Sequence, residues 1–130
     1  MLSENVKRVL NECMWDLATC ADGIPNVVPI GMKFVTEDGK LAIADNFMVV
    51  TAANVKANPN VAISAYDLKT MEAFQIKGTA EYITEGPILE AFKPIAEQLF
   101  KGAIYPKGAV VVTPTQIKNM APGPDNNKEL

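Results

Sequence analysis

The chain has 130 residues, of which 48% are hydrophobic and 21% are charged, and its formal net charge is −3. This length and composition predict one ordinary globular domain rather than a disordered chain. The acidic balance argues against nucleic acid as the main partner, because no basic stripe is present to neutralise phosphates.

The first predicted elements are a helix, a strand and a turn. Ser3 is expected to cap a helix over residues 4–13, because the apolar residues of that stretch recur on one face. Residues 14–20 predict a strand, and Asp22-Gly23 predicts a tight turn after it. A long strand is then expected over residues 25–36.

Alternation along the predicted strand of residues 25–36 assigns its side chains to two faces. Ile30 and Met32 fall on one face, whereas Gly31 and Lys33 fall on the other. Asp38-Gly39 follows as a second hairpin signal and leads into the next strand.

The segment of residues 41–67 is the part around which we expect the rest of the chain to be organised. A short apolar strand is followed by polar Asp45-Asn46, an apolar loop, and a helix that begins at Thr51 as its N-cap and ends before Pro59. A polar strand end close to a helix N-terminus is a candidate anion pocket, since free amides and the helix dipole both favour a phosphate. Taken alone, the arrangement is more typical of an ordinary capped connection.

The clearest strand covers residues 74–82, where apolar and polar residues alternate. Gly78, in the middle of this strand, predicts a bend or bulge that lets the sheet curl. A helix is expected over residues 87–100, with a kink or a break at Pro94.

The last predicted strand covers residues 108–113, with residues 116–120 as its candidate extension. The polar, proline-rich tail of residues 121–130 is expected either to fray or to reach a partner subunit. Six short antiparallel strands, tight hairpins and two or three helices predict a mainly β fold (α+β in some schemes). We therefore expect a small curled β-barrel with flanking helices, in a single domain over residues 1–130.

Several kinds of chemistry are excluded by residue type. The chain contains no histidine and only two cysteines, Cys13 and Cys20. Serine–histidine and cysteine–histidine arrangements are therefore excluded, and two cysteines are too few for a closed zinc site. The polar first twelve residues do not resemble a signal peptide, and no apolar run is long enough to span a bilayer. We expect a cytoplasmic protein with reduced thiols, no metal and no membrane partner.

Four pieces of the chain follow one another in a characteristic order. They are TCADGIPNVVP (residues 19–29), LAIADN (residues 41–46), TAANVKANPNV (residues 51–61) and FQIKGTA (residues 74–80). Each piece is a loose motif, but their combined order and spacing resemble the FMN-binding split-barrel family. That family includes pyridoxamine 5′-phosphate oxidase-like proteins and small FMN-binding proteins. The resemblance implies a six-stranded split barrel that forms a homodimer, with one FMN per subunit bound where two barrels meet.

The resemblance also implies a set of cofactor-binding residues and no catalytic side chain. The residues that it places beside the flavin ring are Pro29, Ile30, Gly31, Met32 and Lys33. The residues that it places on the ribityl and phosphate side are Ala44, Asp45, Asn46, Val50 and Thr51. Lys33 is the candidate cation for the phosphate or for flavin N1, with a solvated lysine as the alternative. Many relatives carry Lys or Arg where this chain has Val50, so one charge-assisted contact is missing or another cofactor is used.

The leading functional hypothesis is an FMN-dependent oxidoreductase, in which the flavin supplies the redox chemistry and the protein supplies orientation and electrostatics. Such a protein would pass hydride or electrons to a small acceptor. The first alternative is a non-enzymatic FMN carrier or electron-transfer protein. The second, suggested by Val50, is a related barrel that uses F420, haem or no cofactor.

Overall fold

The structure, a computed structural model, describes residues 2–130. Within them the chain forms three helices, which are α1 (Glu4–Glu12), α2 (Val50–Ala57) and α3 (Pro87–Phe100). It also forms seven strands, which are β1 (Trp15–Ala21), β2 (Ile24–Ile30), β3 (Lys33–Val35), β4 (Leu41–Asp45), β5 (Asn60–Asp67), β6 (Glu72–Ile83) and β7 (Gly108–Asn119). None of the helices in this described part is long and apolar enough to cross a membrane.

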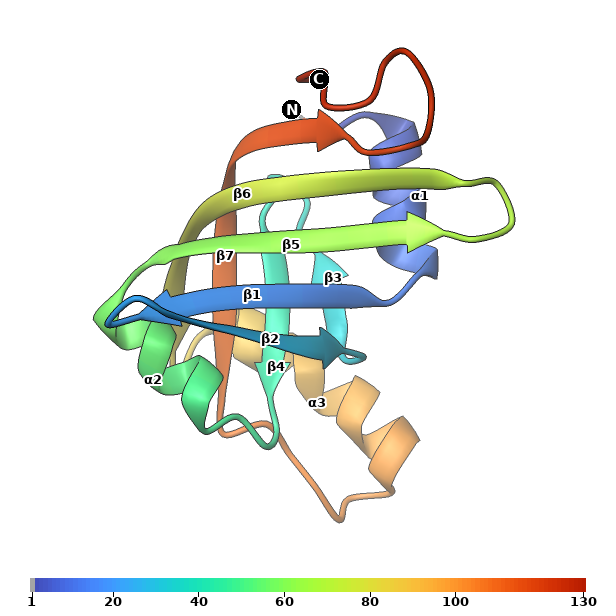
Figure 1. Ribbon diagram of the computed structural model, residues 1–130. Coiled ribbons are helices and arrows are strands. Elements are labelled where there is room, and N and C mark those ends of the chain that lie inside the picture. The colour runs from blue at the N-terminus through green and yellow to red at the C-terminus, as the bar shows by residue number, and fades with distance from the viewer. Residues whose placement is uncertain (1) are drawn as a thin grey trace.

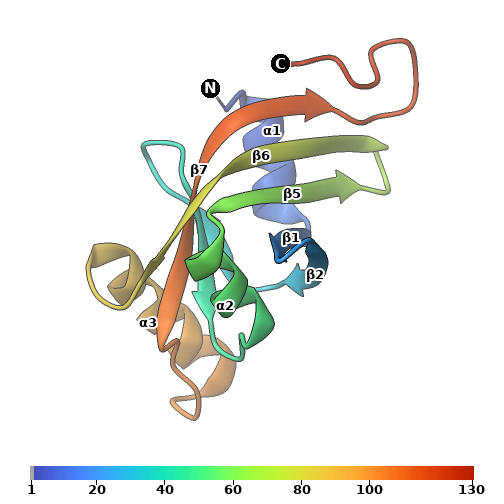
Figure 2. The same ribbon diagram turned by 60° about the vertical axis from the view of Figure 1, so that its left-hand side comes forward.

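The seven strands form one antiparallel sheet in the order β2-β1-β5-β6-β7-β4-β3. Strands β2 and β3 stand at opposite edges of this sheet, yet only Gly31 and Met32 separate them in the chain. The sheet must therefore curl until its two edges approach each other. Figures 1 and 2 show how β6 and β7 bend, so that the sheet turns from the direction of β1 and β5 to that of β4.

The predicted antiparallel split barrel with flanking helices is confirmed, with seven strands in place of six. The difference arises because the single strand expected over residues 25–36 is divided in two. Its first part pairs with β1 and its second part pairs with β4, so the chain changes partners at Gly31 and Met32.

The bend of the sheet occurs where Gly78 was expected to allow it. The pairing of β6 with β7 shifts register between Lys77 and Gly78. A Cβ on Gly78 would collide with the backbone oxygen of Thr113 and would lie 2.9 Å from Val112 Cγ1. Only glycine lets the two strands approach so closely, which confirms the predicted bulge.

Two apolar clusters support the sheet. Helix α1 begins as predicted, with Ser3 Oγ accepting a hydrogen bond from the Val6 amide, and it packs with Trp15 and the larger core cluster. Helix α3 continues through Pro94 without dividing into two helices. It buries Phe92 in the smaller cluster, beside residues of β4.

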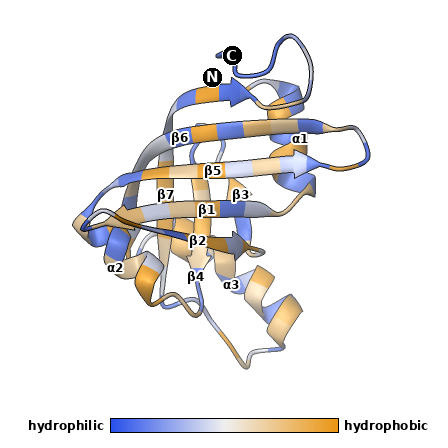
Figure 3. Ribbon diagram, in the orientation of Figure 1, coloured by the Kyte–Doolittle hydropathy of each residue, from blue (hydrophilic) through white to orange (hydrophobic). Residues whose placement is uncertain are grey.

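The tail of residues 121–130 folds back along the end of β7. The amide of Leu130 donates to Ile117 O at 2.8 Å, and the amide of Asn119 donates to Lys128 O at 2.9 Å. Figure 3 shows that this tail is mostly hydrophilic. These hydrogen bonds join the tail to β7, and both its fraying and its contact with a partner subunit stay predictions.

Candidate functional site

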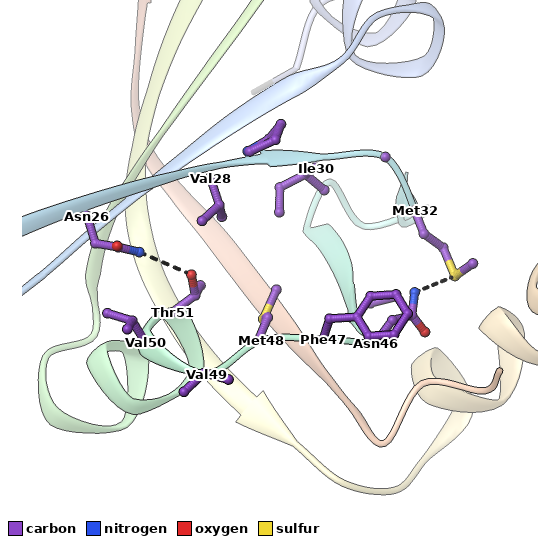
Figure 4. A pocket seen from close by; sticks show the side chains of 13 residues that line it. Asn26, Val28, Ile30, Met32, Asn46, Phe47, Met48, Val49, Val50 and Thr51 are labelled. Carbon is purple, nitrogen blue, oxygen red and sulfur yellow. Dashed lines mark hydrogen bonds between the residues drawn. The ribbon is translucent and has the colours of Figure 1, made fainter.

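A cavity of about 420 Å³ lies where the two edges of the curled sheet approach each other. Three pieces of chain form it: β2 with the following Gly31 and Met32, the end of β4, and the segment of residues 46–51 that leads into α2. Figure 4 shows Val28 and Ile30 extending from β2 toward this 46–51 segment, which carries Met48. The volume of the cavity is typical of small-molecule sites in proteins, which range over roughly 300–1,000 Å³.

Most of the cofactor-binding residues expected from the sequence line this one cavity. They are Pro29, Ile30, Gly31, Met32, Ala44, Asn46, Val50 and Thr51. These residues come from segments before and after β3 in the chain. Strands β2 and β4 lie near opposite edges of the sheet, and the curl of the sheet brings the two edges together. Lys33 and Asp45 do not line the cavity.

Lys33 begins β3, just after the chain has changed partners, and its side chain lies elsewhere. Its ammonium group lies over the ring of Trp15, 5.3 Å from the ring centroid. Burial against this core lowers the pKa of Lys33. Trp15 is fully buried, as expected of a core residue, and its indole N–H donates to Leu10 O at 2.8 Å.

Asp45 ends β4 and lies behind the cavity, with its side chain fully buried. The Met48 amide donates to its Oδ1 at 2.8 Å, and the Tyr82 hydroxyl donates to its Oδ2. Burial, together with this hydrogen bond to Asp45, raises the pKa of Tyr82 to about 12. The tyrosine therefore stays protonated and acts as a donor at neutral pH.

The start of α2 differs from the expectation that Thr51 would cap it. The N-cap position lies two residues earlier, at Val49, and no side chain is bonded to the first-turn amides. The hydroxyl oxygen of Thr51 instead accepts a hydrogen bond from Asn26 Nδ2 at 3.3 Å. The prediction that Thr51 caps the helix was therefore wrong, because its hydroxyl bonds to Asn26 on β2 and not to an amide of the first turn. The helix starts at the edge of the cavity with donors that no side chain satisfies.

Asn46 carries the most unusual polar atom of the site. Its Nδ2 donates weakly to Met32 Sδ at 3.6 Å, as Figure 4 shows. Its Oδ1 is buried without a hydrogen-bond partner, and it is the only buried side-chain N or O atom in residues 2–130 for which this is true. A buried acceptor without a donor costs about 1–3 kcal/mol. A ligand that supplied an N–H or O–H at this point would remove that cost.

The lining of the cavity is neutral. It contains no Lys, Arg, Asp or Glu side chain, and most of its residues are apolar. Sequence reasoning did not assign five of the lining residues, which are Asn26, Val28, Phe47, Met48 and Val49. The alternation of β2 could have added Asn26 and Val28, because they share a face with Ile30. The other three lie in an apolar loop whose direction no local pattern specifies.

Comparison with known proteins identifies the family. The model of the pyridoxamine 5′-phosphate oxidase family matches residues 2–121. The chain belongs to this family. An uncharacterized protein of Methanocaldococcus jannaschii is 40% identical to this family member, in an alignment that covers 98% of this chain and 86% of that protein.

Solved structures share the fold of this family member. HupZ of Group A Streptococcus is 27% identical, with a TM-score of 0.82, and the match covers 95% of this chain and 97% of that chain. An FMN-binding protein of Syntrophomonas wolfei is 14% identical, with a TM-score of 0.73, and the match covers 84% of this chain and 78% of that chain. At this low identity the second likeness establishes the fold alone.

Proposed function

We propose that this member of the pyridoxamine 5′-phosphate oxidase family binds FMN in the cavity between β2 and the 46–51 segment, and that it acts in redox chemistry. One observation carries the proposal. The same neutral cavity holds the unpartnered acceptor of Asn46 and the uncapped first turn of α2. FMN offers an N–H donor on its ring for the first and a phosphate for the second. The FMN-binding relative with the same fold gives further support.

The residues present fit the two ends of such a ligand. Val28, Ile30 and Met48 supply apolar contacts for a flat ring, and Gly31 lets the ring approach the backbone. Asn46, which the resemblance placed on the ribityl and phosphate side, is instead proposed to accept from a ring N–H through its Oδ1. Bound FMN would supply the hydride or electron transfer, while the chain binds and orients it.

The phosphate would be held without a charged side chain. The amides at the start of α2 and the hydroxyl of Thr51 are the donors available for it. Because Val50 stands where many relatives carry a basic residue, we propose that the phosphate adds less to affinity here than a charge-assisted contact would. Such contacts contribute about 1.5–3 kcal/mol each.

A homodimer is part of the proposal, because exposed apolar side chains gather at the cavity. Phe47 is 71% exposed and Val49 is 78% exposed, and Val27 on β2 is also exposed. Figure 3 shows hydrophobic residues at the start of α2. Single protein molecules rarely leave such groups uncovered together, so we propose that a second copy covers them. Sedimentation at micromolar concentration should give twice the chain mass, and a flavin-bound monomer would contradict the dimer.

The visible spectrum of the freshly purified protein tests the cofactor. Bands at about 450 and about 370 nm would identify a flavin, and mass measurement of the released molecule would separate FMN from its relatives. A single band at about 420 nm would indicate F420 or haem instead. A colourless protein that takes up no added FMN would refute the proposal.

We further propose an oxidoreductase rather than a carrier, and steady-state turnover separates the two. The FMN-loaded protein is supplied with reduced nicotinamide and a panel of small electron acceptors. Turnover that depends on bound FMN supports the enzyme. Tight FMN binding with no turnover supports the non-enzymatic carrier.

A further inference from the structure

A cluster behind the cavity, centred on the buried carboxylate of Asp45, has a role that contact with the ligand does not explain. We propose that Asp45, Tyr82 and Lys107 are positioning residues, which act through Met48 to fix the 46–51 segment in the conformation that binds the cofactor. The inference rests on the proposed function for the identity of the ligand. The geometry of the cluster stands independently of it.

Both backbone polar groups of Met48 are held by this cluster. Asp45 Oδ1 accepts from the Met48 amide at 2.8 Å, and Lys107 Nζ donates to Met48 O at 3.4 Å. The same Lys107 Nζ lies 3.8 Å from Asp45 Oδ1. Met48 lies between Asn46 and the start of α2 in the chain. A shift of Met48 would therefore displace the Asn46 acceptor and the first-turn amides of α2, which we propose bind the ring and the phosphate of FMN. Its side chain also lines the cavity and packs against the core.

The cluster is assembled from elements that are distant in sequence. Asp45 ends β4, Tyr82 lies on β6, and Lys107 immediately precedes β7, where its amide donates to Asp45 O at 3.0 Å. The ring of Tyr82 fits only because Gly108 lacks a side chain, since a Cβ there would collide with the phenol. Lys56 of α2 lies over the same ring, 4.3 Å from its centroid.

A buried carboxylate needs partners, because an unpaired charge in a protein interior is strongly unfavourable. Asp45 has a tyrosine hydroxyl, a backbone amide and a lysine around it. Each of these partners also fixes the carboxylate relative to the cavity. The cluster therefore stabilises the fold and orients the 46–51 segment, and an experiment must separate the two effects.

The test uses Tyr82→Phe and Lys107→Met, which each remove one contact and keep the bulk of the side chain. Tyr105→Phe is the matched control, because the Tyr105 hydroxyl donates to Glu97, and neither residue lines the cavity. We expect the Kd for FMN to rise about three- to tenfold in the two cluster variants, which corresponds to losing one hydrogen bond, and to stay unchanged in the control.

Two further readouts distinguish positioning from simple stabilisation. The visible circular dichroism of FMN at saturation should change in the cluster variants, because Met48 and Asn46 of the 46–51 segment would contact the bound ring. Asp45→Asn should bind FMN more tightly than Asp45→Ala, because the amide oxygen still offers an acceptor to Met48. Unchanged Kd and circular dichroism in both cluster variants would overturn the inference. So would a loss of affinity that only follows a loss of thermal stability.

A measurement without ligand keeps this inference separate from the proposed function. Hydrogen exchange of the Met48 amide should be faster in Tyr82→Phe than in the wild type, whereas exchange in α3 should not change. If the wild type binds no FMN but this exchange is faster, the proposed cofactor is wrong and the positioning cluster stands. If the Met48 amide exchanges equally in both proteins, the positioning role is refuted whatever the ligand.

Discussion

Replacing Asn46 by leucine should have opposite effects on stability and on ligand binding. Asn46 Oδ1 is buried without a donor in residues 2–130, and its amide nitrogen donates weakly to Met32 Sδ at 3.6 Å. Leucine has the same branched arrangement of four heavy atoms and no polar atom, so Asn46→Leu removes an unsatisfied acceptor and leaves no void. The free protein should therefore become more stable. Binding of FMN should become weaker, because the ring N–H would lose its acceptor.

The expected changes in stability and affinity follow from Asn46 Oδ1, which lacks a donor in the free protein and would accept from the ring N–H in the FMN complex. An unsatisfied buried acceptor costs about 1–3 kcal/mol, and part of that gain is offset by the lost contact with Met32, so we expect about 1 kcal/mol of added stability. For a domain of this size that corresponds to a rise in Tm of about 3–5 °C. The loss of the hydrogen bond to the ligand should cost about 1–2 kcal/mol, or about a 5- to 30-fold rise in Kd.

Asn54→Leu is the matched control. Asn54 is also buried, but its Nδ2 donates to Thr19 Oγ1 at 3.1 Å, so its removal breaks a satisfied pair and should lower the Tm. Thermal unfolding of the ligand-free proteins and calorimetric titration with FMN measure both effects. If Asn46→Leu lowered the Tm as Asn54→Leu does, and bound FMN like the wild type, the reasoning would be refuted.

Four more outcomes are expected. Thr51→Val should weaken FMN about fivefold more than riboflavin in calorimetric titration, because only FMN carries the phosphate; an equal loss for both ligands would remove Thr51 from the phosphate site. Lys33→Ala should change the Kd for FMN by less than about twofold, since the ammonium lies over Trp15; a tenfold loss would return Lys33 to the site. Gly78→Ala should lower the free energy of unfolding in urea by more than about 2 kcal/mol, because its Cβ meets the backbone of β7, and an unchanged midpoint would contradict the bulge. A backbone amide and Arg8 lower the pKa of Asp67. The ionised Asp67 therefore stabilises the folded protein above about pH 4, and this stabilisation is lost as the pH falls through the lowered pKa. Arg8→Met should accordingly lose stability at pH 7, with a gap to the wild type that narrows in acid.

The parts of the fold that the sequence predicted correctly depend on local signals. The alternation of β6, the turn at Asp22-Gly23 and the bulge at Gly78 each arise from the residues at that position. Asp22 and Gly23 both have positive φ, at 53° and 74°, which is the backbone conformation that this dipeptide favours. Such features need little from the rest of the chain, so a single sequence is sufficient to find them.

The break between β2 and β3 could not be predicted in this way. Gly31 and Met32 carry no strong turn signal, and alternation continues on both sides of them. The break exists because β2 pairs with β1 whereas β3 pairs with β4, and that choice belongs to the whole sheet. The expectation that Lys33 shares the face of Gly31 assumed an unbroken strand, and the binding of a cofactor by Lys33 stays a prediction. The prediction that Thr51 caps α2 also rested on local sequence alone. In the structure the Thr51 hydroxyl accepts from Asn26, which is distant in sequence.

The electrostatics of the site depend on this long-range assembly even more strongly. A phosphate close to the 46–51 segment would be repelled by the buried carboxylate of Asp45 unless that charge were compensated, because the interior screens charges poorly. Lys107 and the donors from Tyr82 and Met48 supply the compensation from behind the cavity, and they do so without placing a charge in its lining. The sequence marks Asp45 as a polar strand end beside a helix, and the family resemblance placed it among the expected cofactor-binding residues. The side chains that make this carboxylate a support for the site come from β6 and from the loop before β7, so only the folded sheet distinguishes the two roles.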